Sequence, residues 1–134
     1  MEPVLNNVRK MIEDDNFAKF MGIKLLKLEK GYSKVSMSIT NDMVNLHNVA
    51  HGGAIFTLAD VAFAAAGNSH GRKAVALSMN INYRSPVKEG MNLIAEASEE
   101  SIGRKTALYR MIVKTEDGKL IASSQGTVFI MNES

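Results

Sequence analysis

The most apolar stretch of this 134-residue sequence contains a single carboxylate. Across residues 54–66 only Thr57 and Asp60 are polar. A run of this length and alanine content favours a helix, and a helix without a polar face has to be surrounded by other elements. A buried carboxylate is costly unless it is hydrogen-bonded, paired or placed in a cavity. Asp60 is therefore either satisfied by nearby backbone groups or available for acid-base or nucleophilic chemistry.

Two adjacent glycines, Gly52 and Gly53, stand at the start of this predicted helix, and Gly67 and Gly71 are expected to end it. The first N–H groups of a helix have no acceptor within it, and the positive end of the helix dipole lies there. Because glycine carries no side chain, it leaves these donors open to a ligand. The start of the helix is therefore a candidate binding site.

Two histidines, His47 and His51, lie four residues apart beside a polar loop over residues 41–50. This spacing brings two metal ligands together only on a helix, and no third ligand is in view. We therefore predict no metal site. His51 is expected to hold the loop through backbone hydrogen bonds.

Composition narrows the classes of function. Sixteen Lys and Arg against 14 Asp and Glu give a net charge of +2 without a block of one sign, and tryptophan is absent. Nucleic acid is therefore not an expected partner. The absence of cysteine excludes thiolate chemistry. Without a signal sequence or a long apolar span, we expect a cytoplasmic protein that does not bind membranes, with one domain over residues 1–134.

The remaining segments have the patterns of a helix followed by strands. Residues 3–15 have the pattern of an amphipathic helix. Phe17, Phe20 and Met21 are expected in the core, with the wall of a pocket as the alternative. Alternation of apolar and polar residues predicts strands over residues 23–29, 34–40, 73–83, 92–99, 105–115 and 120–131. Asp117-Gly118 between two such runs is typical of a hairpin. Consecutive strands imply an antiparallel sheet with the apolar helix against its concave face, an α+β fold.

The segment NLHNVAHGG over residues 45–53, followed by FTLAD over 56–60, resembles the signature of the PaaI-like thioesterases of phenylacetic acid degradation. NYRSP over residues 82–86 and GRKT over 103–106 resemble further motifs of this group. Asn48 stands where members usually have glycine, and Asn tolerates the left-handed backbone conformation well. Arg84 stands one residue before the position that many members give to arginine. The resemblance extends from about residue 20 to the end.

This resemblance implies a hotdog fold, in which a curved antiparallel sheet wraps one long buried helix, with an N-terminal helix in addition. It also implies that the protein hydrolyses an acyl-CoA thioester. Asp60 would be the catalytic carboxylate and the Gly52 N–H would contact the thioester carbonyl, while general base and nucleophile both stay open for Asp60. Asn45 would orient water or the carbonyl, or alternatively form an Asx turn. His51 belongs to the same catalytic loop.

The substrate contacts implied for coenzyme A are Gly53, Arg84, Arg104 and Lys105, although the last two fit a solvated hairpin turn equally well. Coenzyme A is part of the substrate, so no separate cofactor is expected. A non-catalytic acyl-CoA-binding hotdog protein is the alternative, and the presence of Asp60 argues against it. A hydratase of this fold would have histidine five residues after the aspartate, where this chain has Ala65.

The resemblance further implies homodimers that pair into a homotetramer. Helix geometry points the same way, because Gly52 and Asp60 are eight residues apart and their backbones would be separated by roughly 12 Å. A carbonyl contact and a base acting on that carbonyl must both lie within about 3 Å of the reacting atoms. We therefore predict that each site takes Gly52 from one subunit and Asp60 from its two-fold mate.

Overall fold

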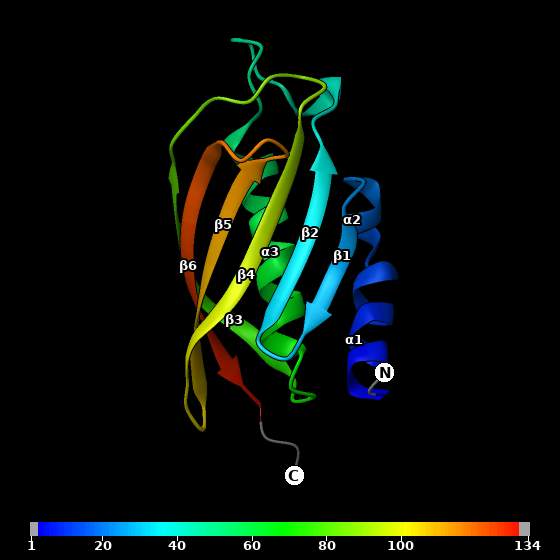
Figure 1. Ribbon diagram of the computed structural model, residues 1–134, viewed down its shortest axis with the longest axis vertical. Coiled ribbons are helices and arrows are strands. Elements are labelled where there is room, and N and C mark those ends of the chain that lie inside the picture. Colours follow the sequence, from blue (N-terminus) through cyan, green and yellow to red (C-terminus); the bar gives the residue numbers. More distant parts are fainter. Residues whose placement is uncertain (1–2, 132–134) are drawn as a thin grey trace.

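Six strands form one antiparallel sheet that curves around a single long helix (Figure 1). A computed structural model describes residues 3–131. Along the chain the elements are α1 (Pro3–Glu13), α2 (Asn16–Phe20), β1 (Lys24–Glu29), β2 (Tyr32–Ser38), the 3-10 turn η1 (Asn41–Met43), α3 (Gly52–Asn68), β3 (Ala74–Tyr83), β4 (Asn92–Ile102), β5 (Thr106–Thr115) and β6 (Leu120–Ile130). The strand order in the sheet is β1-β2-β4-β5-β6-β3.

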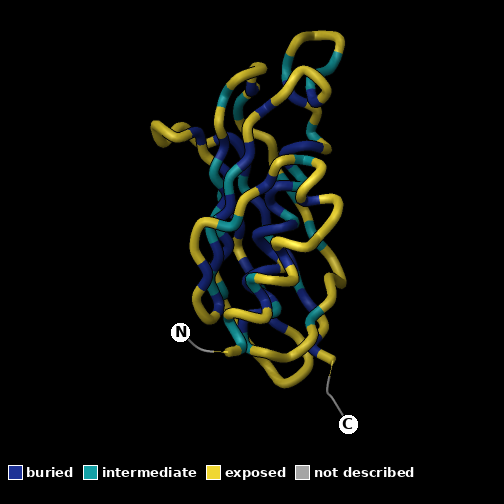
Figure 2. The backbone as a smooth tube through the Cα atoms, turned by 90° about the vertical axis from the view of Figure 1, so that its right-hand side faces the viewer, coloured by how far each residue is buried: buried dark blue, intermediate teal, exposed yellow. Residues whose placement is uncertain are grey.

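Helix α3 occupies the concave side of the sheet, as predicted. Ten of its 17 residues are buried, which is too many for a helix with one face in solvent. Phe63 packs edge-on against Tyr109 of β5, with ring centroids 5.9 Å apart. Figure 2 shows the buried residues gathered along this helix and the strands around it, with exposed residues on the turns. The predicted α+β architecture, a buried helix wrapped by an antiparallel sheet, is confirmed.

Three hydrogen bonds fix where α3 sits along the sheet. The Ser33 hydroxyl of β2 donates to the Ala62 carbonyl (2.6 Å). The Ser69 hydroxyl donates to the Ala66 carbonyl (2.6 Å) and accepts from the Gly31 N–H in the β1–β2 turn (2.7 Å). All three bonds are buried, and breaking a buried hydrogen bond leaves unpaired polar groups at a cost of about 1–3 kcal/mol. The helix is therefore held in one register, and so are the residues it carries.

The N-terminal helix ends earlier than predicted. Helix α1 ends at Glu13, and Asp15 begins α2 as its N-cap, where its side chain accepts a hydrogen bond from the Ala18 N–H (2.9 Å). An N-cap residue adopts an extended backbone, which interrupts the preceding helix. Helix α3 continues through Gly67 to Asn68 and so ends between the two predicted stop residues, Gly67 and Gly71, the second of which takes a positive φ of 88° in the following turn.

The prediction that Phe17 and Phe20 belong to the core is wrong. Their exposed fractions are 57% and 81%, and the two rings stack on each other with centroids 6.5 Å apart. Helix α2 has only five residues, and Ala18 is the one that it buries. Because α2 is so short, burying the side chain at position 18 leaves those at the neighbouring positions exposed to solvent. Met21 is partly buried against the core.

Strand β3 forms one edge of the sheet and pairs, among the described strands, with β6 alone. The predicted alternation is interrupted by a bulge between Ala76 and Ser78. Val75 and Leu77 are 41% and 59% exposed. An unpaired edge with exposed apolar side chains is a typical site of association with another strand. Within residues 3–131, none of the helices has the length and apolar character needed to cross a membrane.

Candidate active site

The loop that precedes α3 is closed by its own backbone. Val44 and Ala50 form an antiparallel bridge, and the Asn45 N–H donates to the Val49 carbonyl (2.8 Å). The Asn45 side-chain oxygen accepts from the His47 N–H (2.8 Å), which is the Asx turn considered from the sequence. Asn48 has a φ of 62°, the left-handed conformation for which asparagine is suited. A catalytic role for Asn45 stays a prediction, with its oxygen already engaged in the turn.

The start of α3 is tied to the loop on one side and to the β3–β4 connection on the other. The His51 N–H donates to the Met43 carbonyl (2.7 Å), as expected for a residue that holds the loop, and the Ala50 N–H donates to the Val87 carbonyl (2.7 Å). The first intrahelical bonds come from Ala54 and Ile55 to the His51 carbonyl. The N–H groups of Gly52 and Gly53 therefore have no acceptor in the helix, as predicted.

Tyr83, at the end of β3, lies directly over Gly52 and was missed by the sequence reasoning. Its hydroxyl donates to the Gly52 carbonyl (2.9 Å), and a Cβ added at Gly52 would lie 2.9 Å from the Tyr83 ring. Burial raises the pKa of the Tyr83 hydroxyl, so it stays protonated at neutral pH. The Gly52 carbonyl shares a peptide plane with the Gly53 N–H. Tyr83 thus holds the direction of one of the free donors and disfavours any side chain at position 52.

The two glycines give a matched pair of stability predictions. At Gly53 an added Cβ meets nothing within 4 Å. Gly53→Ala should therefore stabilise the fold by about 0.5–1 kcal/mol, because alanine has fewer unfolded conformations. Gly52→Ala should instead cost about 1 kcal/mol, because the Tyr83 ring has to move and its hydrogen bond is lost. Urea unfolding measures the free energy of unfolding of both variants. Equal values would show that the Tyr83 ring can move aside without loss of stability.

A cavity of about 480 Å³ opens beside the helix start. It is lined by Gly52 and Ile55 of α3, by Tyr83 at the end of β3, and by Arg84 and Pro86 of the segment that follows. Its volume is within the range of small-molecule sites. The Arg84 backbone is held by a hydrogen bond from its N–H to the Ile121 carbonyl (2.7 Å), while its side chain is exposed at the rim. Arg84 and Gly52, both predicted site residues, are therefore brought together.

Asp60 lies two turns further along α3 and is partly buried. Burial raises the pKa of its carboxyl, and the negative charge of Asp15 raises it further. Asp60 is not among the residues that line the cavity at Gly52. The eight-residue separation along a regular helix corresponds to roughly 12 Å. One chain by itself thus keeps the proposed base and the proposed carbonyl contact apart.

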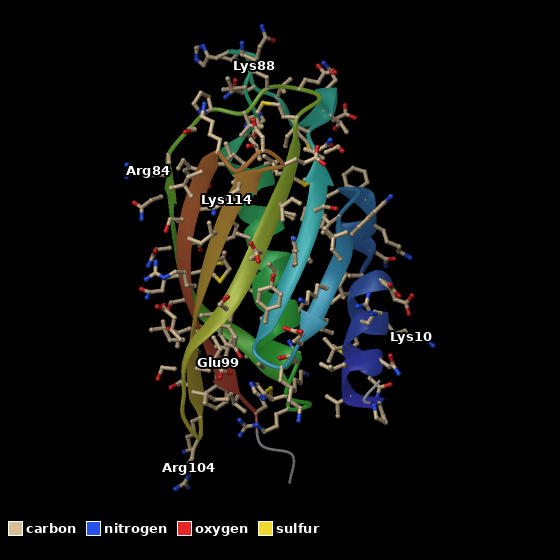
Figure 3. All side chains as sticks on the ribbon, viewed as in Figure 1. Lys10, Arg84, Lys88, Glu99, Arg104 and Lys114 are labelled. Atoms are coloured by element: carbon tan, nitrogen blue, oxygen red, sulfur yellow. The ribbon has the colours of Figure 1, made fainter. Side chains whose placement is uncertain are left out.

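The other two basic residues of the predicted site lie elsewhere. Arg104 and Lys105 belong to the turn between β4 and β5, and Figure 3 shows Arg104 at the opposite end of the molecule from Arg84. In one chain they do not meet the cavity at Gly52. The part of the chain that the structure describes contains no cluster of three His, Asp or Glu side chains able to hold a metal ion.

Comparison with known proteins decides the family. The thioesterase superfamily matches residues 47–122, more than half of the chain, including the end of the loop, α3 and strands β3 to β5. This chain belongs to the thioesterase superfamily. Its relatives include a putative esterase of Archaeoglobus fulgidus, 45% identical over 123 residues that cover 92% of this chain and 80% of the relative. They also include the acyl-coenzyme A thioesterase PaaI of Escherichia coli K12, which is 37% identical over 120 residues. These residues cover 90% of this chain and 86% of PaaI.

Solved structures agree with this placement. The E. coli PaaI structure superposes with a TM-score of 0.94 at 34% identity, covering 98% of this chain and 95% of that one. A Streptococcus mutans UA159 protein bound to acetyl CoA gives a TM-score of 0.79 at 29% identity, and the match covers 83% of this chain and 90% of that one. The predicted hotdog fold and the PaaI-like acyl-CoA thioesterase family are therefore confirmed, and the chain is an enzyme of this family. The roles of individual residues stay predictions.

Proposed function

We propose that this thioesterase hydrolyses an acyl-CoA to the free acid and coenzyme A, with Asp60 as general base or nucleophile and the Gly52 N–H at the thioester carbonyl. The observation that carries the proposal is the pair of free N–H groups at the start of α3 beside a cavity that admits a ligand. Gly53, next to Gly52, provides the second donor. Such donors stabilise the negative charge that develops on a carbonyl oxygen during hydrolysis.

The bond changes follow from these groups. As a general base, Asp60 takes a proton from water while the water oxygen bonds to the carbonyl carbon, and the carbon–sulfur bond then breaks with both electrons on sulfur. The proton held by Asp60 passes to the coenzyme A thiolate. As a nucleophile, Asp60 would itself displace the thiolate and form an anhydride that water then cleaves. Both routes end in the same products.

Two subunits complete each site in this proposal. The exposed edge and apolar side chains of β3 support pairing with β3 of a second copy, and a two-fold axis would reverse the partner. The end of one chain that carries Gly52 and Arg84 then approaches the other end of its mate. This arrangement bridges the separation between Gly52 and Asp60 along one helix. It also allows Arg104 and Lys105 of the mate to reach the phosphates of coenzyme A bound beside Arg84. Two such dimers would form the homotetramer.

The test of this function is a hydrolysis assay with short, long and aryl acyl-CoAs. Release of the coenzyme A thiol reports the hydrolysis of each substrate. Turnover of at least one class supports the proposal. Saturable binding of acyl-CoA without thiol release would favour the alternative, a non-catalytic acyl-CoA-binding hotdog protein.

The raised pKa of Asp60 predicts a pH profile. As a base or nucleophile Asp60 must be ionised, so kcat/KM should rise with pH through the pKa of its carboxyl, at a midpoint above the ordinary value of about 3.9. Asp15→Asn removes one cause of the raised pKa and retains an N-cap residue, so the midpoint should move to lower pH. Asp14→Asn removes an equal charge from the neighbouring exposed position and serves as the control. Equal midpoints for both variants would show that Asp15 has no special influence.

A further inference from the structure

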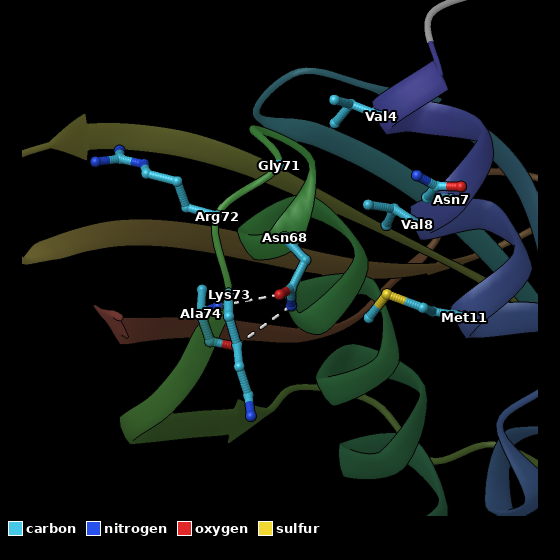
Figure 4. A pocket seen from close by; sticks show the side chains of 9 residues that line it. All are labelled: Val4, Asn7, Val8, Met11, Asn68, Gly71, Arg72, Lys73 and Ala74. Carbon is cyan, nitrogen blue, oxygen red and sulfur yellow. Dashed lines mark hydrogen bonds between the residues drawn. The ribbon is translucent and has the colours of Figure 1, made fainter. Parts of the chain in front are cut away.

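Two exposed cations, the basic pair Arg72 and Lys73, directly precede β3 and have no role in the hydrolysis proposed above. Figure 4 shows them at the wall of a cavity of about 410 Å³ between α1 and the end of α3, with both side chains directed away from α1. Within residues 3–131, neither forms a salt bridge. The basic pair can therefore bind an anion that comes from outside its own chain.

The backbone that carries the basic pair is held as an extension of β3. The Met131 N–H donates to the Lys73 carbonyl (2.8 Å), which continues the pairing of β3 with β6. The Asn68 side chain at the end of α3 accepts from the Ala74 N–H (3.0 Å) and donates to the Ala74 carbonyl (3.3 Å), as Figure 4 shows. The two cations therefore extend from a defined position at the beginning of this edge strand.

Strand β3 is exposed on both of its faces in the single chain. None of its ten residues is buried, whereas every other described strand buries at least one residue. An exposed edge strand of this kind is completed by pairing with another strand, and the proposed dimer supplies β3 of a second copy. The position of the basic pair in that dimer follows from the geometry of the pairing.

Antiparallel pairing of two β3 strands joins opposite ends of the two chains. Within one chain Lys73 and Arg84 are eleven residues apart along an extended segment, roughly 36 Å at about 3.3 Å per residue. A two-fold axis through the middle of the paired strands places the beginning of one β3 against the end of the other, at a spacing of about 4.8 Å. Lys73 of the mate then lies beside Tyr83 and Arg84, which line the cavity at Gly52.

The basic pair lies nearer to this edge than the turn that carries Arg104 and Lys105. The Ile130 N–H of β6 donates to the Lys105 carbonyl (2.6 Å), and Ile130 pairs with Ala74 of β3. Lys105 is therefore two strands, roughly 10 Å, further from the dimer edge. An anion at the mouth of the cavity meets the basic pair of the mate first.

We propose that the basic pair of one subunit binds the phosphates of coenzyme A when the thioester occupies the site at Gly52 of the other subunit. The inference rests on the proposed function and its shared site, and it adds two binding residues from the mate. Arginine binds a phosphate through two parallel N–H donors, and lysine adds a point charge. Together with Arg84 of the first subunit, the basic pair gives the cavity mouth a positive charge that attracts an anionic substrate.

The first experiment replaces both cations in Arg72→Gln/Lys73→Gln. The substrate is whichever of butyryl-, decanoyl- and phenylacetyl-CoA the parent hydrolyses best. At an ionic strength of about 0.1 M, KM should rise about tenfold while kcat changes little, because phosphates far from the reacting carbonyl are bound equally before and in the transition state. At about 1 M the screening length falls to about 3 Å, so KM of the variant and of the parent should converge.

Two controls separate phosphate binding from a change in the fold. The acyl-N-acetylcysteamine thioester has the same acyl group without phosphates, so the variant and the parent should hydrolyse it equally well. Lys10→Gln/Lys114→Gln removes two exposed lysines from other surfaces of the molecule (Figure 3) and should retain the parent KM for acyl-CoA. Equal losses on both kinds of substrate would show a structural role and overturn the inference.

Subunit exchange determines which chain supplies the cations. A mixed dimer of Asp60→Ala and Gly52→Pro subunits has one complete site, with Gly52 from the first subunit and Asp60 from the second. Arg72→Gln/Lys73→Gln should raise KM of the restored activity when the Gly52→Pro subunit carries it, and leave KM unchanged when the Asp60→Ala subunit carries it.

The outcomes distinguish the inference from the function on which it rests. Restored activity with an unaltered KM in both arrangements, or with the reverse dependence, would overturn the inference and leave the proposed function intact. Full exchange without restored activity would disprove the shared site and the inference with it. Absence of thiol release by the parent with all the acyl-CoAs would refute the proposed function as well.

Discussion

Asp60→Asn is expected to lower the turnover of acyl-CoA by about two to four powers of ten. The amide keeps the shape of the carboxylate and can neither accept the proton from water nor attack the carbonyl. Steady-state thiol release at saturating substrate measures the effect, and Asp14→Asn, which removes an exposed carboxylate outside the site, is the control. Undiminished turnover by a folded Asp60→Asn protein would remove Asp60 from the mechanism.

The same substitution should not weaken the fold, and this separates a catalytic loss from a structural one. Because burial raises the pKa of Asp60, the native state favours its protonated form. The stability that comes from this preference is fully present below the unfolded pKa of about 3.9 and is lost as pH rises through the folded pKa. The amide that replaces the carboxylate in Asp60→Asn carries no charge, so the Tm of this variant at pH 7 should equal or exceed that of the parent. In thermal unfolding scans at pH ~4, the difference in Tm between the variant and the parent should disappear.

The second large effect is the return of activity when two inactive proteins exchange subunits. Asp60→Ala removes the base or nucleophile, and Gly52→Pro removes the N–H donor. A mixed dimer of these subunits has one site with an intact Gly52 and an intact Asp60. Random pairing makes about half of the dimers mixed, each with one working site of two, so roughly a quarter of the parent activity should return. A catalytic pair within a single chain would give no recovery.

The structure shows how to build the donor-deleting subunit. His51 has φ −58° and ψ 139°, an extended conformation that a following proline requires, and proline is favoured at the first position of a helix. A ring at position 52 would nevertheless collide with Tyr83. Gly52→Pro should therefore be combined with Tyr83→Ala, with Tyr83→Ala alone as the control for loss of the tyrosine. Exchange is followed with a mass tag, and full exchange without recovered activity would disprove the shared site.

The sequence by itself determined the elements and the turns that depend on local conformation. The apolar run predicted α3 and its enclosure by other elements, because a helix without a polar face must be enclosed, although Asp60 is only partly buried. Asn48 and Gly118 take the positive φ values, 62° and 96°, that their residue types permit. The free N–H groups of Gly52 and Gly53 also follow from position in a helix alone. These features depend on neighbours along the chain, and so they can be predicted from it.

Only the tertiary structure decided which distant residues meet. Tyr83 lies 31 residues after Gly52 and covers it, a contact that no periodicity predicts. Arg84 shares a cavity with Gly52, whereas Arg104 lies at the other end of the molecule. Phe20 is of an apolar residue type that is common in cores, yet it is 81% exposed. The reason is that Ala18 occupies the buried position of the short helix α2. Strand alternation predicts which side chains share a face, but the order of strands in the sheet determines which of those faces is covered.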